Sequence, residues 1–435
     1  MAAAAAVASA AAAAAGPLRL GPRCGVPVRR LAAVAGVARR TVAAKVAGSL
    51  VGPSSPPVAS AALPLTAALG GGGRHLRGMA APAGAPAFQE LPVLSHDALI
   101  NDFEGFVSDL REACRHVGFF VLAGLPPRTV ALHAELLRVA GEFFERPEGE
   151  KGLIDYRLSP HFRGYMWQGA ENTAGRRDER EQIEFGSEEG AVQLGASSTA
   201  QLFERLRGPN QWPSNPPELR TVVSDWLEDM EALSRLLTHA LPASLGLDAG
   251  ALDGLFGRPH VQAKLVHYPA GGCDGTDQVD AGGLGVGAHS DSGFLTLLLQ
   301  DDVGGLEVMN SAGVWVAAPP LPGSLVCNLG EVLQLLTGGS YLSTVHRVRR
   351  PRPGRGRLSA PYFWNPSLDA IVEPLPELRG ESAMAELQRG AHASNRLLPS
   401  YGMNAFKSLA RSHPQVFARH HPDLECLPDG QVIAR

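Results

Sequence analysis

The spacing of hydrophobic positions changes past the middle of the chain. Before that point, apolar residues recur at steps of three and four over residues 103–117, 130–144 and 219–241. This spacing predicts three amphipathic helices, each burying one face. Short apolar runs at Leu91–Leu94 and Phe119–Leu122 predict strands beside the first two helices. Together these elements predict an α/β layer followed by a long helix.

From about residue 259 to about residue 366 the apolar period becomes two, as expected of half-buried strands. The predicted strands, separated by turn residues, are Val261–Tyr268, Gly293–Gln300, Leu306–Met309, Val314–Ala317, Ser324–Leu329, Thr344–Arg349 and Arg357–Trp364. Regularly spaced short strands favour a double-sheet jelly roll over a parallel sheet. The predicted fold class is therefore mainly β with flanking helices, a double-stranded β-helix core with an α/β amino-terminal layer. Two more helical stretches are predicted in the tail, at Ala383–Leu398 and Asn404–Ala418.

The amino-terminal segment differs in composition from the rest. Residues 1–89 contain nine Lys or Arg and no Asp or Glu, and they are rich in Ala, Ser and Val. Such leaders resemble mitochondrial or chloroplast transit peptides, and the composition does not separate the two organelles. The alternatives are a disordered extension or a start at Met79, which would leave a cytoplasmic protein.

These patterns predict five regions along the chain. They are a transit peptide or disordered leader (1–88), an amino-terminal α/β region (89–205), a helical connection (206–256), a jelly-roll catalytic core (257–370) and a helical tail (371–435).

Charge and cysteine content exclude several classes of protein. The 435 residues are 45% hydrophobic and 19% charged, which is typical of a soluble globular protein. Removing the nine leader cations from the net charge of −4 leaves about −13 on the remainder, which argues against nucleic-acid binding. We predict no membrane span. Five widely separated cysteines without a CxxC spacing argue against a disulfide framework or a zinc site.

Candidate chemistry begins at Ala288–Gly305, which reads AHSDSGFLTLLLQDDVGG. His289 and Asp291 stand one residue apart, so on a strand both side chains point the same way. His346, several predicted strands later, supplies a third ligand. Two histidines and one carboxylate occupy one face of a non-haem Fe(II) octahedron and leave three positions for a cosubstrate and O2.

A second group of polar residues fits a dicarboxylic cosubstrate. Arg357 and Ser359 share one strand face and offer a guanidinium fork and a hydroxyl. Tyr268, at the end of an earlier strand, is a third candidate contact. His267 points to the opposite face and is predicted to be a packed histidine. The Arg176–Phe185 segment permits a strand at the edge of a substrate pocket, although charge clusters of this kind are usually solvated.

The motifs resemble a known family. They are HSD at 289–291, STVHRV at 343–348, RLS at 357–359, Tyr268-Pro269, QDDVGGLEV at 300–308 and FWNPS at 363–367. Near the amino terminus PVL, ACRHVGFF and GEFFERPEGEK add to them. Over roughly residues 90–420 the chain resembles the 2-oxoglutarate/Fe(II)-dependent oxygenases of the isopenicillin N synthase-like family.

This resemblance implies that His289, Asp291 and His346 bind Fe(II). It also implies that Arg357 and Ser359 bind the distal carboxylate of 2-oxoglutarate, that Tyr268 contacts this cosubstrate, and that O2 is consumed with release of succinate and CO2. Family members often carry Asn at the position of Val266, so one cosubstrate contact is missing here. Gly330-Glu331 replaces a usual Gly-Asp, a change that we expect to alter a turn and not the iron site.

Three functions fit these residues. The first is oxidation of a small metabolite, by hydroxylation or desaturation, with 2-oxoglutarate as cosubstrate. The second is an oxidase of the same fold that needs no 2-oxoglutarate, as isopenicillin N synthase is. The third is a non-catalytic ligand-binding jelly roll that acts as a sensor. No motif indicates the substrate or the oligomeric state.

Overall fold

A computed structural model describes residues 87–173, 176–192, 199–270, 283–378, 397–427 and 431–435 of the chain. Nearly all of the predicted leader and of the predicted helix Ala383–Leu398 lies outside these ranges, so both stay predictions. None of the helices in the described ranges has the length and apolar character needed to cross a bilayer.

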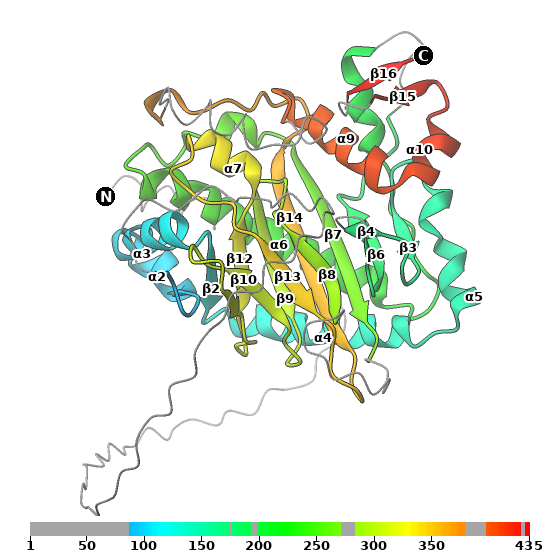
Figure 1. Ribbon diagram of the computed structural model, residues 1–435, viewed down its shortest axis with the longest axis horizontal. Coiled ribbons are helices and arrows are strands. Elements are labelled where there is room, and N and C mark those ends of the chain that lie inside the picture. The colour runs from blue at the N-terminus through cyan, green and yellow to red at the C-terminus, as the bar shows by residue number, and fades with distance from the viewer. Residues whose placement is uncertain (1–86, 174–175, 193–198, 271–282, 379–396, 428–430) are drawn as a thin grey trace, which may run out of the picture. The chain divides into compact units, whose positions relative to one another are not determined.

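Two sheets form the jelly-roll core that the sequence predicts (Figure 1). The larger sheet runs in the order β1 (Val93–Ser95), β2 (Phe119–Ala123), β12 (Leu325–Leu329), β9 (Leu295–Gln300), β14 (Arg357–Ser367), β7 (Pro259–Tyr268), β6 (Glu181–Gly186), β3 (Gly164–Met166). The smaller sheet runs in the order β11 (Trp315–Ala317), β10 (Leu306–Met309), β13 (His346–Arg349), β8 (Leu284–His289). Neighbouring strands are antiparallel except β1 with β2. Two short hairpins complete the strands, β4 (Asn172–Thr173) with β5 (Arg176–Arg177) and β15 (Leu424–Cys426) with β16 (Val432–Ala434).

The helices include the three that the apolar spacing predicts. The predicted three are α3 (Phe103–His116), α4 (Pro127–Phe144) and α6 (Leu219–Ser244). The others in the described ranges are α2 (His96–Asn101), α5 (Glu148–Lys151), α7 (Glu331–Leu336), α9 (Tyr401–Ser412) and α10 (Pro414–His420). Helix α6 packs on the outer face of the larger sheet, where Thr238 accepts a hydrogen bond from the Trp364 indole at 2.9 Å. Trp226 meets Tyr362 edge to face on the same side.

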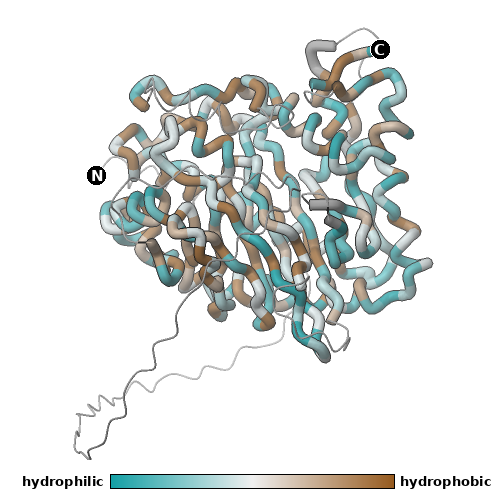
Figure 2. The backbone as a smooth tube through the Cα atoms, in the orientation of Figure 1, coloured by the Kyte–Doolittle hydropathy of each residue, from teal (hydrophilic) through white to brown (hydrophobic). Residues whose placement is uncertain are grey.

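Hydrophobic and hydrophilic positions are interspersed along the strands of the core (Figure 2). Strand alternation divides the hydrophobic core into an outer and an inner part. On β7, Ala263 and Leu265 belong to the cluster that includes the helices. Val266 and Tyr268 belong instead to an inner cluster with Val286 of the smaller sheet. The inner face of the larger sheet is therefore the one that faces the smaller sheet.

Two boundaries differ from the sequence pattern for identifiable reasons. Strand β8, which none of the predicted strands covers, begins at Leu284, because Val286 pairs with Val348 across the smaller sheet. The predicted helix Asn404–Ala418 is two helices, α9 and α10. His413 precedes Pro414, and a following proline disfavours helical backbone.

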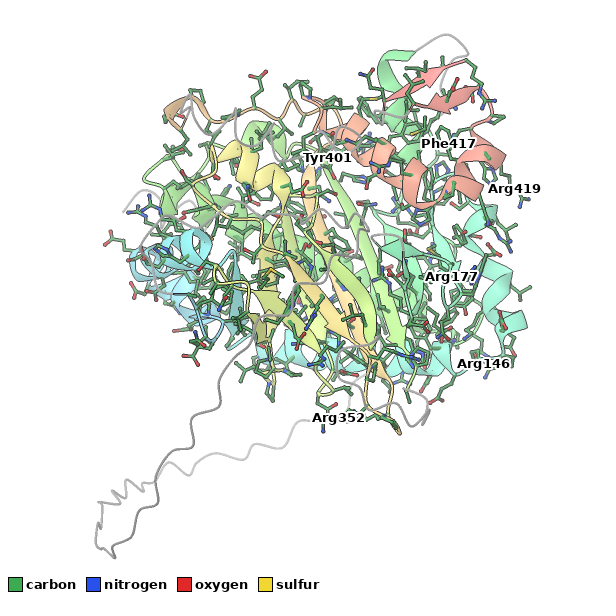
Figure 3. The ribbon with its side chains drawn as sticks, viewed as in Figure 1. Arg146, Arg177, Arg352, Tyr401, Phe417 and Arg419 are labelled. Carbon is green, nitrogen blue, oxygen red and sulfur yellow. The ribbon has the colours of Figure 1, made fainter. Side chains whose placement is uncertain are left out.

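The carboxy-terminal segment packs beside the chain that follows α5. The Phe162 ring contacts Phe406 of α9 and also His413, the residue between α9 and α10. Figure 3 labels Tyr401 and Phe417 on these two helices. The tail thus brings His413 next to a region more than 240 positions earlier in the sequence.

Candidate functional site

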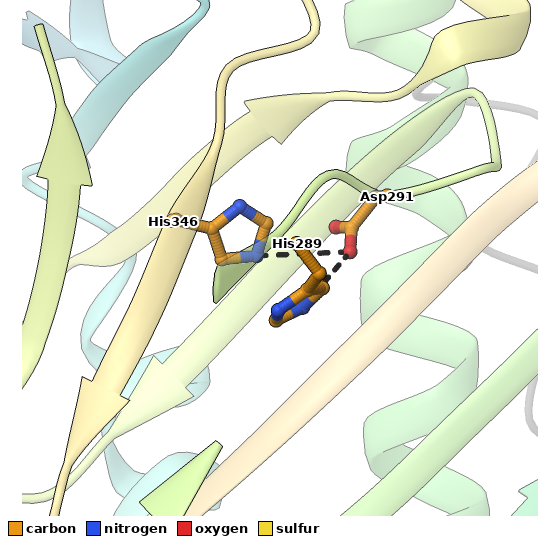
Figure 4. A group of neighbouring side chains, drawn as sticks. All are labelled: His289, Asp291 and His346. Atoms are coloured by element: carbon orange, nitrogen blue, oxygen red, sulfur yellow. Dashed lines mark ion pairs between the residues drawn. The ribbon is translucent and has the colours of Figure 1, made fainter. Parts of the chain in front are cut away.

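His289, Asp291 and His346 converge between the two sheets, as predicted (Figure 4). One ligand atom of each lies within 4.8 Å of the others. Asp291 Oδ1 is 3.8 Å from His289 Nε2 and 3.7 Å from His346 Nε2. The sequence motifs therefore come together at one point.

The two histidines meet because they are direct cross-strand partners of β8 and β13, with ring centroids 4.3 Å apart. The prediction that Asp291 shares a strand with His289 is wrong. Strand β8 ends at His289, and Asp291 lies in the following turn. The Glu331 backbone N–H donates to the Asp291 carbonyl at 2.8 Å, so the start of α7 holds this turn.

Hydrogen bonds to backbone carbonyls select the tautomer of both imidazoles. His289 Nδ1 is 2.8 Å from the Gly287 carbonyl, and His346 Nδ1 is 3.1 Å from the Thr344 carbonyl. A carbonyl oxygen only accepts, so each Nδ1 carries the proton. Each Nε2 of a neutral ring then turns a free lone pair toward Asp291. Burial and the neighbouring His346 ring lower the pKa of His289 to about 4, which keeps it neutral near pH 7.

The Asp291 carboxylate is oriented by two neutral donors that sequence reasoning missed. Oδ2 accepts from Thr296 Oγ1 at 2.6 Å and from Asn328 Nδ2 at 2.7 Å. These donors lie opposite each other on β9 and β12. Burial alone would raise the pKa of Asp291, but the two imidazoles and these hydrogen bonds hold it below its ordinary value. Both donors bind Oδ2, so Oδ1 is the carboxylate oxygen that faces the Nε2 atoms of the two histidines.

This donor set fits a divalent iron ion. In the tautomer that these hydrogen bonds select, two imidazole Nε2 atoms and one carboxylate oxygen point at one another. Neutral nitrogens and a carboxylate on one face form the set found in non-haem Fe(II) oxygenases.

Arg357, Ser359 and Tyr268 also come together. Arg357 is fully buried, and its Nη1 donates to Ser359 Oγ at 3.1 Å. Its Nη2 donates to Gln300 Oε1 at 3.2 Å, a contact absent from the sequence prediction. The guanidinium carbon lies 5.0 Å from the centre of the Tyr268 ring, since Arg357 and Tyr268 pair across β14 and β7.

The Arg357 guanidinium still lacks a charged partner in these contacts. Both Nη donors go to neutral oxygens, and Nε has no hydrogen-bond partner among the described residues. A buried cation with a free donor is suited to a ligand carboxylate, which accepts charge-assisted bonds.

Two departures from the family pattern have different consequences. Val266 packs in the inner apolar cluster opposite Ser359, so this position offers no hydrogen bond to a ligand. Glu331 does more than alter a turn. Besides its backbone bond to Asp291, its carboxyl group accepts from Ser290 Oγ at 2.7 Å, and burial raises its pKa. The substituted residue therefore supports the turn that carries Asp291.

Comparison with known proteins agrees with this geometry. The 2OG-Fe(II) oxygenase superfamily matches residues 261–366, and the amino-terminal region of non-haem dioxygenases in morphine synthesis matches residues 91–215. The homoarginine-6-hydroxylase 2-ODD-C23 of Glycine max is 33% identical over 302 residues, covering 68% of this chain and 89% of that protein.

Solved structures show the same fold. JOX2 in complex with 2OG, Fe and JA is 27% identical, with a TM-score of 0.54 over 70% of this chain and 83% of that one. A 2OG-Fe(II) oxygenase family protein from Caulobacter crescentus is 26% identical, with a TM-score of 0.58 over 68% of this chain and 93% of that one. The relatives are 2-oxoglutarate-dependent enzymes, which favours the first of the three functions above. The chain belongs to the isopenicillin N synthase-like 2-oxoglutarate/Fe(II)-dependent oxygenases, and it is a dioxygenase that oxidises a small organic metabolite with release of succinate and CO2.

Proposed function

We propose that His289, Asp291 and His346 hold the Fe(II) of this dioxygenase. The observation that carries the proposal is the convergence of two lone-pair-bearing Nε2 atoms on the free Oδ1 of Asp291. Bound Fe(II) activates O2 for the oxidative decarboxylation of 2-oxoglutarate and the oxidation of the substrate.

The protein's own residues prepare this chemistry. Thr296 and Asn328 fix the plane of the Asp291 carboxylate, and the Gly287 and Thr344 carbonyls fix the two imidazoles. Partners of this kind hold metal ligands in one orientation before the metal arrives.

We also propose that Arg357 and Ser359 bind the distal carboxylate of 2-oxoglutarate, with Tyr268 against it. The free Nε of Arg357 and its neutral Nη partners support this role. A guanidinium offers two parallel donors to a carboxylate, and Gln300 holds the fork from the other side. The apolar inner cluster around Val266 keeps water away from the cosubstrate.

For the substrate, the supporting observation is the name of a relative. The Glycine max protein is named for hydroxylation of homoarginine, which is an amino acid. We infer that the substrate of this enzyme is also a small amino acid.

Anaerobic titration calorimetry of the full chain tests the two halves of the site separately. Wild-type protein should bind one Fe(II) and then 2-oxoglutarate. His289→Ala should lose tight Fe(II) binding, whereas Arg357→Gln should keep the Fe(II) and lose the 2-oxoglutarate. His239→Ala, on α6 and paired with Asp253, is the matched histidine control.

The assignment is wrong if His289→Ala binds Fe(II) as tightly as the His239→Ala control. The cosubstrate assignment is wrong if Arg357→Gln binds 2-oxoglutarate like the wild type.

A further inference from the structure

A second polar group lies on the inner face of β6 and β7, and we call it the inner-face network. Its members are charged or amide side chains from four parts of the chain: Glu171, Arg180, Gln182, Glu184, Lys264 and His413. Lys264 Nζ is 2.7 Å from Glu184 Oε1 and 3.2 Å from Glu171 Oε1. Arg180 binds the other oxygen of Glu171. The network includes part of the Arg176–Phe185 segment, for which the sequence permits a strand at the edge of a pocket.

The network begins where the cosubstrate residues end. Lys264 shares a face of β7 with Val266 and Tyr268, by strand alternation. Tyr268 is one of the groups that raise the Arg180 pKa, and the Tyr268 ring lies against Arg357. A molecule next to the cosubstrate would therefore meet these charges.

The network is not a second metal site. Glu171, Glu184 and His413 have ligand atoms within 4.8 Å of one another, but the Lys264 ammonium contacts both carboxylates. Burial opposes ionisation of Glu171, yet Lys264 and Arg180 outweigh it and lower its pKa to about 2. The same lysine keeps Glu184 ionised. The network thus presents fixed positive and negative charges side by side.

Two buried atoms of the network lack any partner among the described residues, Arg180 Nε and Gln182 Oε1, whereas His413 Nε2 lies 3.5 Å from Glu184 Oε1. The Gln182 and His413 side chains are only 1% exposed. Buried polar atoms in folded proteins are nearly always paired. The unpaired Arg180 atom is a donor, and the unpaired Gln182 atom is an acceptor.

The opposite face of the same strands shows what a structural network looks like. In this outer-face network, Glu181 binds Lys151 at 2.6 Å, Tyr165 at 2.7 Å and His267 at 2.9 Å. None of these four side chains has an unpaired buried atom. The inner-face network differs, and its Glu171, Arg180 and Lys264 side chains keep 12%, 15% and 17% of their surface exposed. What sets the inner-face network apart is its unpaired buried atoms, not its exposure, since His267 in the outer-face network is 25% exposed.

We propose that the inner-face network binds the zwitterionic head group of an α-amino-acid substrate. The substrate carboxylate takes the free Arg180 donor and the Lys264 charge. The substrate ammonium donates to Gln182 Oε1 and Glu184, and His413 closes the subsite from the carboxy-terminal segment. This inference rests on the proposed function, and it adds which atoms recognise the substrate and why both ends of the head group are needed.

Succinate release by the full-length iron-loaded enzyme tests the subsite. The probes are L-homoarginine, L-arginine and L-lysine, each compared with its Nα-acetyl derivative and its methyl ester. We expect at least one free amino acid to stimulate succinate release. Capping either end should lower kcat/KM at least tenfold, because each cap removes one of the two charges that the network faces.

Glu184→Gln supplies the test on the protein side, with Glu181→Gln as control. Both substitutions remove the charge of a buried β6 carboxylate that is paired with a lysine, Lys264 for Glu184 and Lys151 for Glu181. Only Glu184 is on the inner face, toward the proposed subsite. Glu184→Gln should raise KM for the free amino acid at least tenfold and leave KM for the Nα-acetyl derivative within twofold. Glu181→Gln should change neither KM. Circular dichroism checks that both variants are folded at the assay temperature.

Equal activity of capped and free compounds overturns the inference, and so does an equal KM increase in the two variants. If the enzyme binds Fe(II) and 2-oxoglutarate but no amino acid stimulates it, the subsite is wrong and the proposed iron and cosubstrate ligands stand. If neither Fe(II) nor 2-oxoglutarate binds, both proposals fail.

Discussion

Replacing Asn328 with Ala should weaken Fe(II) binding without touching a metal ligand. Asn328 Nδ2 donates to Asp291 Oδ2 at 2.7 Å, and the acceptor is ionised. A hydrogen bond to a charged group contributes about 1.5–3 kcal/mol, and loss of such a partner typically costs about 10–100-fold in metal affinity. Thr296 still holds the same oxygen at 2.6 Å. We therefore expect about a tenfold higher Kd for Asn328→Ala, and about 100-fold when Thr296→Val is added.

The assay is anaerobic Fe(II) titration by calorimetry, with thermal unfolding measured on the same samples without metal. Asn310→Ala is the matched control. Asn310 is also buried and hydrogen-bonded, but its side chain binds the Phe88 carbonyl and the Val314 backbone N–H. It should lower stability and leave the Kd for Fe(II) unchanged.

Two results would refute the reasoning. If Asn328→Ala binds Fe(II) within twofold of the wild type, the carboxylate does not depend on this donor for its orientation. If Asn310→Ala raises the Kd by the same factor, the loss reflects a general loosening of the fold and not the bond to Asp291.

Three further outcomes follow from the contacts of the site and its supports. Arg357→Lys should raise KM for 2-oxoglutarate about 10–100-fold in a succinate assay, because an ammonium cannot offer two parallel donors; an unchanged KM would contradict the clamp. The pKa of Glu181 is lowered because its three hydrogen-bond donors outweigh burial, so its stabilisation is present above its unfolded pKa and disappears as pH falls through the lower folded value. Glu181→Gln should therefore lower the free energy of unfolding, measured in urea, by about 3–5 kcal/mol at pH 7 and by less as the pH approaches 3. A loss that grows on acidification would contradict this pH dependence. A Cβ at Gly330 would overlap the Gly293 carbonyl, so Gly330→Ala should lower both the melting temperature and the Fe(II) affinity, whereas Gly149→Ala, with open space around it, should lower neither.

Local periodicity was enough to predict much of the fold and the candidate residues. Alternation alone places Arg357 and Ser359 on one strand face, and the structure joins them at 3.1 Å. The same alternation separates Tyr268 from His267, which stacks on Phe144 and binds Glu181 on the outer face. These predictions hold because they depend only on residues one or two apart in the sequence.

Contacts that depend on strand register were beyond sequence reasoning. Thr296 and Asn328 are ordinary residues of apolar strands, and only the pairing of β9 with β12 places both beside Asp291. Asp291 itself lies past the end of β8, held by the start of α7, so period two was the wrong reason for a correct grouping with His289. His413 reaches the inner-face network only through packing of the tail.

The pairing of β6 with β7 shows how strongly register and function depend on each other in this fold. Glu184 pairs with Lys264 on the inner face, whereas Glu181 pairs with His267 on the outer face. A slip of one residue in β6 would turn every side chain of that strand to the other face. Glu184 would then enter the apolar layer under the helices, and Ile183 would face the charges of the inner-face network. The first change would bury a charge without a partner, and the second would place a hydrophobic side chain among ions. The two networks, on opposite sides of the sheet, therefore both disfavour the shifted register. The charges that we assign to substrate recognition therefore also help to hold the wall on which Tyr268 and the cosubstrate residues are placed.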